Sequence, residues 1–151
     1  MTETSWQTLM DEAPGLASFG EDRLDGKVAY LATVRTDGKP RAHPVTPIIG
    51  EGRCFIFVEP DSQKVRDLRD NGYYCLHCAM NDSSGSSGEF QLTGVAKQID
   101  SDEVRNVAES VSNYRPAAKA LLFELQPLEV LSVAYRGGRP ARNRWTAASV
   151  C

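Results

Sequence analysis

A short strand-like run that leads directly into a capped helix is the feature that most constrains the fold of this chain. Residues 55–58 are apolar and β-prone, and Pro60 ends the run. Ser62 supplies N-cap chemistry, and Val65 and Leu68 give the segment that follows an apolar helical face. The sequence therefore predicts a strand, a tight connection and a helix in immediate succession.

Two cations lie at the start of this predicted helix. Lys64 and Arg66 fall in or near its first turn, where the helix macrodipole disfavours positive charge. Free backbone N–H groups, the Ser62 hydroxyl and two cations together can bind an anion such as a phosphate. The same residues also occur at ordinary solvated helix starts, so this segment alone leaves both interpretations open.

Two further strands precede this run. Residues 28–34 predict a strand that turns at Asp37-Gly38, which is a strong hairpin signal. Residues 41–49 predict the next strand, and residues 54–58 predict the one that leads into the helix. Three consecutive hairpin-connected strands followed by a helix are therefore expected.

Later segments add more strands and a second helix. Residues 73–80 and 89–99 predict two strands, joined by a flexible Ser/Gly-rich hairpin tip over residues 81–88. Asp100-x-x-Glu103 resembles a capping box that begins a helix, and residues 123–135 predict the last strands. The predicted elements are therefore mostly strands, with few helices between them.

The N-terminal residues predict a helix that packs on the sheet. Thr4-x-x-Gln7 is a weak capping box, Trp6 begins an apolar stripe, and Pro14-Gly15 ends or kinks the helix. The first residues are polar and acidic, unlike a signal peptide, and the sequence has no apolar run of membrane-spanning length. We therefore expect a cytoplasmic protein with no membrane partner.

The order of these elements resembles the flavin-binding split-barrel family that includes pyridoxamine 5′-phosphate oxidase and many small FMN- or deazaflavin-dependent oxidoreductases. Each motif is common, and their order and spacing over residues 24–136 carry the resemblance. The matching segments are Ala32-Thr33-Val34, Asp37-Gly38-Lys39-Pro40, Phe57 followed by Ser62-Gln63-Lys64, Val65-Arg66-Asp67-Leu68, and residues 90–96.

The resemblance implies a fold and an assembly. The expected fold is mainly β, of the α+β class: a six-stranded antiparallel split β-barrel with flanking helices. Residues 1–151 would form a single domain, with an N-terminal helix region over residues 1–23 and a C-terminal tail over residues 136–151. The family builds its cofactor site between two subunits, so we expect a homodimer.

The resemblance also implies a function, which is FMN-dependent oxidation or reduction of a small-molecule substrate, with hydride transfer through the flavin. A deazaflavin-dependent reductase on the same fold, and a flavin-binding stress or sensor protein with little turnover, are the alternatives. The chain lacks the family's Arg-Leu-His substrate signature, so pyridoxamine phosphate is not an expected substrate. No acid/base pair or nucleophilic triad stands out, so we assign no catalytic residue.

Residues around the helix start form the expected cofactor site. Ser62 and Lys64 would hold the phosphate, and the strand at residues 43–46 would lie along the isoalloxazine ring. Pro44 and Pro47 remove backbone donors, so this strand is expected to be an edge strand or a bulged strand that faces a ligand. Pro44 could equally be a plain protector of an edge strand. His43 is either a cofactor contact or a satisfied barrel histidine. The expected cofactor-binding residues are Ser62, Gln63, Lys64, His43, Pro44, Val45, Thr46, Phe57, Val58, Arg144 and Trp145.

The end of the sequence concentrates four arginines next to a tryptophan. In the resembled family a C-terminal Trp/Arg segment lies near the flavin or substrate of the partner subunit, which implies that role for Arg144 and Trp145. A nucleic-acid stripe and a frayed end that touches nothing are the other interpretations. The net charge of −3 argues against nucleic acid as a partner, because non-specific binding needs a basic surface.

Cys75-Leu76-His77-Cys78 contains a C-x-x-C motif, which in other contexts is a redox or zinc site. Strand alternation places Cys75 and His77 on one face and Cys78 on the other. That arrangement forms neither a disulfide nor a shared metal site, so we expect structural thiols and no bound metal. Reduced thiols agree with a cytoplasmic location.

Overall fold

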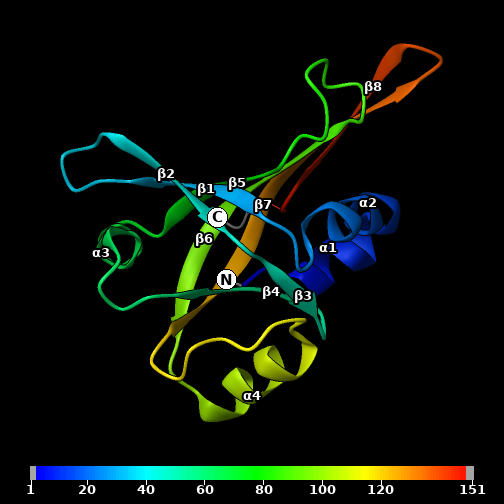
Figure 1. Ribbon diagram of the computed structural model, residues 1–151. Helices are drawn as coiled ribbons and strands as arrows, with labels where there is room; N and C mark the ends of the chain where they lie inside the picture. The colour runs from blue at the N-terminus through cyan, green and yellow to red at the C-terminus, as the bar shows by residue number, and fades with distance from the viewer. Residues whose placement is uncertain (1–2, 149–151) are drawn as a thin grey trace.

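The computed structural model describes residues 3–148. An eight-stranded antiparallel sheet curls around an apolar core, and four helices lie around it (Figure 1). The strands are β1 (Ala29–Val34), β2 (Pro40–Val45), β3 (Ile48–Gly50), β4 (Arg53–Val58), β5 (Tyr73–Cys78), β6 (Glu89–Ile99), β7 (Leu121–Arg136) and β8 (Arg139–Thr146). The helices are α1 (Trp6–Glu12), α2 (Pro14–Leu24), α3 (Gln63–Asp70) and α4 (Asp102–Val111).

The longest strand, β7, organises the sheet. The strand order is β2-β1-β5-β6-β7-β4-β3, with β8 paired to β7. One edge of β7 pairs with β6, whereas the other pairs with β4 near its start and with β8 near its end. β2 and β3 stand at the two ends of the order, and only Thr46 and Pro47 separate them in the chain. The edge position of β2 confirms the expectation from its prolines.

The fold is of the expected class, an α+β antiparallel split barrel, but it has eight strands where the sequence predicts six. One extra strand arises because the segment at residues 41–49 divides into β2 and β3. Pro47 lacks the N–H that a continuous ladder needs, so the strand stops there. The carbonyl of Pro47 instead accepts a hydrogen bond from the backbone N–H of Gly26 (2.9 Å).

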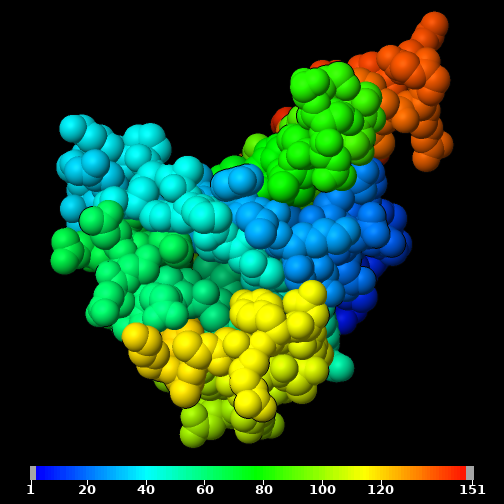
Figure 2. Space-filling model, viewed as in Figure 1, coloured from blue at the N-terminus to red at the C-terminus, as the bar shows by residue number. Residues whose placement is uncertain are grey.

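The other extra strand lies in the segment predicted as a C-terminal tail, residues 136–151. That prediction is wrong for β8, which forms a hairpin with the second half of β7. Gly137 and Gly138 make the turn with φ angles of 57° and 77°, which suit glycine. Figure 2 shows the hairpin tip standing clear of the body, beside the loop between β5 and β6. Residues 149–151, the end of this predicted tail, fall outside the described residues.

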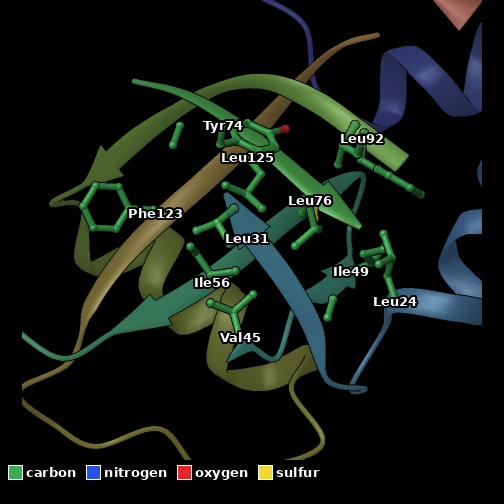
Figure 3. Close-up of a cluster of buried hydrophobic side chains, with 14 of the residues drawn as sticks. Leu24, Leu31, Val45, Ile49, Ile56, Tyr74, Leu76, Leu92, Phe123 and Leu125 are labelled. Atoms are coloured by element: carbon green, nitrogen blue, oxygen red, sulfur yellow. The ribbon is translucent and has the colours of Figure 1, made fainter. Parts of the chain in front are cut away.

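Aliphatic side chains from the inner face of the sheet fill the barrel (Figure 3). Leu31, Ile56, Leu76, Leu92 and Leu125 come from five different strands, and each has no solvent exposure. Burying one such side chain contributes about 1.5–3 kcal/mol to stability. Because these side chains occupy the interior, a ligand as large as a flavin has to bind outside the barrel.

Two helices cover one end of the barrel. Trp6 from α1 and Leu24 from α2 are buried, and the Trp6 ring lies 6.2 Å from that of Phe90. The predicted N-terminal helix is present but begins one residue later than expected: Ser5 is the N-cap, and its N–H donates to Thr8 Oγ1 (3.1 Å). A new helix, α2, begins at the proline that was expected to end or kink the first.

Helix α4 packs on a second side of the sheet. Ala108 of α4 is buried in a small cluster with Ile48, Phe55 and Leu122. Ser101 caps this helix by accepting a hydrogen bond from the N–H of Val104 (3.2 Å), so the helix begins slightly later than the predicted box. None of the helices in the described chain is long and apolar enough to cross a membrane.

Candidate functional site

Helix α3 begins with a capped first turn, as the sequence predicts. Ser62 is the N-cap: its Oγ accepts a hydrogen bond from the N–H of Lys64 (3.2 Å), and its carbonyl accepts one from the N–H of Val65 (3.1 Å). Within residues 3–148 the hydroxyl hydrogen of Ser62 and the N–H of Gln63 have no acceptor. These donors lie at the positive end of the helix and suit an anion.

The buried Asp67 ties α3 to strands β1 and β2. Its Oδ2 accepts hydrogen bonds from Thr33 Oγ1 (2.7 Å) and Arg41 Nε (2.9 Å). His43 Nε2 lies 3.1 Å from the same threonine oxygen, and Arg41 also donates to Gln63 Oε1. We call Thr33, Arg41, His43, Gln63 and Asp67 the Asp67 cluster.

Strand register explains how the cluster forms. β1 and β2 pair with Thr33 opposite Arg41 and Leu31 opposite His43, so Thr33, Arg41 and His43 share one face of the hairpin. That face also carries the buried Leu31, and Asp67 reaches it because it is on the buried side of α3. The polar cluster is therefore an extension of the barrel core toward the helix.

Burial and neighbouring charges set the protonation of the cluster. Burial alone would raise the pKa of Asp67, but hydrogen bonds from Thr33 and Arg41 hold it below its ordinary value, so Asp67 is a carboxylate. Burial and the charges of Lys64 and Arg41 lower the pKa of His43, which is therefore neutral at neutral pH. Burial also lowers the pKa of Lys64, whose ammonium an anionic partner would stabilise.

A family model for pyridoxamine 5′-phosphate oxidase matches residues 23–135. The chain belongs to this family. The match covers β1 to β6 and all but the last residue of β7, and it includes the start of α3 and the whole Asp67 cluster. It confirms the resemblance seen in the sequence. No curated protein matches the chain.

Solved structures share the split-barrel fold. A heme-binding protein from Mycobacterium smegmatis is 21% identical, with a TM-score of 0.66 over 83% of this chain, which spans 56% of that protein. General Stress Protein 26 from Bacillus anthracis str. Sterne is 15% identical, with a TM-score of 0.61 over 86% of this chain and 98% of the other. An F420 reductase is 18% identical, with a TM-score of 0.57 over 73% of this chain and 94% of the other. These identities show the fold alone.

In this member of the pyridoxamine 5′-phosphate oxidase family, four of the predicted cofactor residues lie together. Ser62 is the N-cap of α3, Gln63 and Lys64 are its first two residues, and His43 shares one face of the β1–β2 hairpin with Arg41. Gln63 is held through its side-chain oxygen by Arg41. The structure therefore brings these four residues together within one chain, and their contact with a phosphate stays a prediction.

The residues that follow His43 on β2 have separate surroundings. Pro44 is exposed, and Val45 is buried in the core. The carbonyl of Thr46 accepts a hydrogen bond from the hydroxyl of Tyr114 (3.4 Å). A contact of these three residues with a flavin ring is a proposal. Such a contact would use the strand backbone and the exposed side chain of Pro44.

The side chains of the predicted pair on β4 also have surroundings other than the start of α3. Phe57 packs with the α4 cluster, and the guanidinium carbon of Arg105 lies 5.1 Å from its ring centroid. Val58 is buried in the barrel. β3 pairs with β4 only as far as Phe55, so beyond that point this edge of β4 has no strand partner in the described chain. Any ligand contact of Phe57 and Val58 would use this backbone edge.

Arg144 and Trp145 lie on β8, at the far end of the sheet from α3 (Figure 1). Trp145 is buried, and its indole N–H donates to Glu12 Oε1 (3.0 Å). Arg144 is exposed. Within one chain neither residue reaches the start of α3, so a contact with the cofactor would require a second subunit.

Sequence reasoning assigned no role to Thr33, Arg41 or Asp67. The signal that would have found them is Asp67 itself, a carboxylate between Val65 and Leu68 on the buried side of a helix. A buried charge needs a partner, so its presence predicts a cation and hydrogen-bond donors on the neighbouring strands. Which donors those are depends on strand register, which the sequence does not state.

A surface cavity of 570 Å³ runs along α3, but on its outer side. Ser62, Gln63, Arg66 and Arg69 are among its lining residues, whereas Lys64 and His43 are not. The cavity and the polar cluster therefore meet only at the first turn of the helix. The cluster is the better candidate for the site, since it combines a cation, hydrogen-bond donors and a buried carboxylate.

Strand β5 places its cysteines as alternation predicts. Cys78 is buried, whereas Cys75 and His77 are half-buried on the opposite face. Cys54, Cys75 and Cys78 are free thiols. Residues 3–148 contain no group of three or more His, Cys, Asp or Glu side chains positioned to hold a metal ion.

Proposed function

We propose that this chain is an FMN-dependent oxidoreductase that holds the cofactor phosphate at the start of α3. The observation that carries the proposal is the meeting of the donor-rich helix start with Lys64 and Arg41, in a member of the pyridoxamine 5′-phosphate oxidase family. FMN would supply the hydride chemistry at its ring. The chain would supply binding, orientation and electrostatics, and no catalytic residue is assigned.

The residues present fit an organic phosphate. The Ser62 hydroxyl, the Gln63 N–H and the Lys64 ammonium are donors, and each charge-assisted hydrogen bond contributes roughly 1.5–3 kcal/mol. Arg41 donates to Gln63 Oε1, which leaves the amide NH₂ of Gln63 free to donate as well. Arg41 also keeps N–H groups beyond the one bound to Asp67. Several donors at and beside the start of α3 are therefore available to an anion.

We further propose that the working unit is a homodimer with the cofactor between subunits. The barrel interior is filled, and Lys64 does not line the surface cavity along α3, so a groove between two subunits is the roomier place for a flavin at the cluster. Tyr30 and Tyr73 on the outer face of the sheet are 51% and 61% exposed. Exposed aromatic side chains of this size are typical of surfaces that bind a partner.

A deazaflavin coenzyme is the second candidate, and the charge of the site favours it. Arg41 is paired with Asp67 and His43 is neutral, which leaves the charge of Lys64 unbalanced among these side chains. The phosphodiester of a deazaflavin coenzyme carries one negative charge, whereas a phosphate monoester such as that of FMN carries nearly two. An F420 reductase has the same fold.

The absorption spectrum of freshly purified protein is the first test, because FMN, deazaflavin and haem have distinct bands. A haem spectrum in place of a flavin spectrum would contradict the proposal. Reduction by NAD(P)H followed by reoxidation by an acceptor would separate an enzyme from a flavin-binding protein with little turnover. We propose a cytoplasmic setting for this chemistry, in keeping with the free thiols.

Calorimetric titration of variants with FMN and with the deazaflavin coenzyme tests where the cofactor phosphate binds. Lys64→Ala should weaken affinity by about 1.5–3 kcal/mol, roughly ten- to a hundredfold. Arg66→Ala is the matched control, because Arg66 lies on the same helix but lines the outer cavity. Unchanged affinity in Lys64→Ala would overturn the placement at Lys64, and a loss only in Arg66→Ala would move the site to the outer cavity.

A further inference from the structure

The geometry points to a positioning role for Asp67 and Thr33: they fix His43 as the Nε2–H tautomer and leave Nδ1 as a hydrogen-bond acceptor for the cofactor. His43 is the group that would meet the ligand, whereas Asp67 and Thr33 act through it. The identity of the ligand rests on the proposed function. The tautomer is a property of the protein without ligand.

In the chain of hydrogen bonds from Asp67 through Thr33 to His43, donors and acceptors can be assigned in only one way. A carboxylate only accepts, so the Thr33 hydroxyl donates its one hydrogen to Asp67 Oδ2 (2.7 Å). Thr33 Oγ1 is then an acceptor for His43 Nε2, which lies 3.1 Å away. Nε2 must therefore carry a hydrogen, and in a neutral imidazole Nδ1 carries the lone pair.

The neighbouring side chains keep Asp67 ionised and His43 neutral. Asp67 has a side chain only 2% exposed, and Arg41 Nε donates to the same carboxylate oxygen as Thr33 (2.9 Å). Burial with the charges of Lys64 and Arg41 keeps His43 neutral, although Asp67 acts in the opposite direction. The assignment of donors and acceptors requires an ionised Asp67 and a neutral His43, and both conditions are met.

The acceptor nitrogen makes the site selective for one kind of ligand. Nδ1 of His43 has no hydrogen-bond partner among residues 3–148. Its neighbours Lys64 and Arg41 are donors that suit a phosphate. A ligand with a phosphate and a nearby hydroxyl, such as a ribityl phosphate, satisfies both the cations and Nδ1. Inorganic phosphate satisfies only the cations.

The two histidines of the chain make the tautomer measurable. Full-length protein labelled with nitrogen-15 histidine gives ring signals in a two-bond proton–nitrogen correlation at neutral pH, and His77→Gln assigns those of His43. Hydrogen bonding to Cys78 raises the pKa of His77 to about 9, so His77 should appear doubly protonated as an internal reference. For His43 we expect the nitrogen shifts of a protonated Nε2 and an unprotonated Nδ1, with no averaging between the two tautomers. A protonated Nδ1, or averaged tautomers, would overturn the inference.

Matched variants of Thr33 test whether the hydrogen bonds from Asp67 through Thr33 fix the His43 ring. Thr33→Val removes the hydroxyl with little change of volume, and His43 should then exchange between tautomers, which averages its nitrogen shifts. Thr33→Ser keeps a hydroxyl and should restore the fixed tautomer. The His77 signals should be unchanged in both variants, which shows that the fold is retained. A fixed Nε2–H tautomer in Thr33→Val would show that Asp67 and Thr33 do not position the ring.

Titration of the labelled protein tests the acceptor. FMN should shift the His43 Nδ1 signal toward that of a hydrogen-bonded nitrogen, and inorganic phosphate should not. FMN that binds by calorimetry but leaves Nδ1 unmoved would overturn the acceptor role. Absence of FMN binding would overturn the proposed function and the cofactor part of this inference, while the ligand-free spectra decide the fixed tautomer separately.

Discussion

The start of α3 and the β7–β8 hairpin both carry basic side chains, but the chain treats these charges differently. At α3, Arg41 is fixed by an ion pair to the buried Asp67 (2.9 Å). On the hairpin, Arg142 and Arg144 are exposed and have no ion-pair partner in the described chain. Of these two regions, only the first has an arginine held by an ion pair in the described chain, and this is why we propose the ligand site there. The hairpin is held by backbone pairing and by Trp145.

The largest effect is expected at Trp145, which anchors the hairpin. Trp145→Ala removes a buried ring and the hydrogen bond to Glu12, so stability should fall by about 3–5 kcal/mol. Urea unfolding measures the change, and Trp145→Phe should lose less because it keeps most of the packing. Truncation after Gly138 should destabilise the chain as well. A wild-type unfolding midpoint in Trp145→Ala would show that β8 is only an appendage.

Arg41→Met should have the next largest effect. The substitution leaves Asp67 buried with Thr33 as its remaining donor, and we expect a loss of about 2–3 kcal/mol, below that of a fully buried pair because Arg41 is partly exposed. Arg142→Met on the hairpin is the matched control and should change stability by less than about 0.5 kcal/mol. Equal losses in the two variants would remove the contrast between the regions.

The same contrast separates what the sequence could predict from what it could not. The Asp37-Gly38 turn, the Ser62 cap and the alternation of β5 are local signals, and each was predictable. The Asp67 cluster joins residues distant in sequence, and its geometry depends on the β1–β2 register. Strand β8 has no clean apolar alternation, and it forms because two glycines turn the chain back along the free edge of β7.

Acid should weaken the α3 region before it affects the hairpin. The folded pKa values of His43 and Asp67 lie below their unfolded values, so the unfolded chain binds more protons and stability falls as pH falls. The His43 contribution is present above about pH 6.5 and is lost below it, and that of Asp67 is lost further into acid, from about pH 4. Urea unfolding against pH measures both.

His43→Gln provides the matched control for this pH dependence. It should lack the loss that begins as the pH falls below about 6.5, whereas Trp145→Phe should retain it. Because His43 is partly exposed, we expect the difference between the two profiles to stay below about 1 kcal/mol. Parallel profiles for wild type and His43→Gln would show that the ring does not couple to folding.

The smallest effect on stability is expected at Arg144, whose role tests whether the hairpin serves a second subunit. Arg144 is exposed, so Arg144→Ala should change stability by less than about 0.5 kcal/mol. If the hairpin completes the partner's cofactor site, this variant should nevertheless bind FMN more weakly. Arg139→Ala, beside the turn, is the control. Equal FMN affinity in wild type and Arg144→Ala, or a monomeric mass of the flavin-loaded protein in light scattering, would leave α3 as the whole binding site.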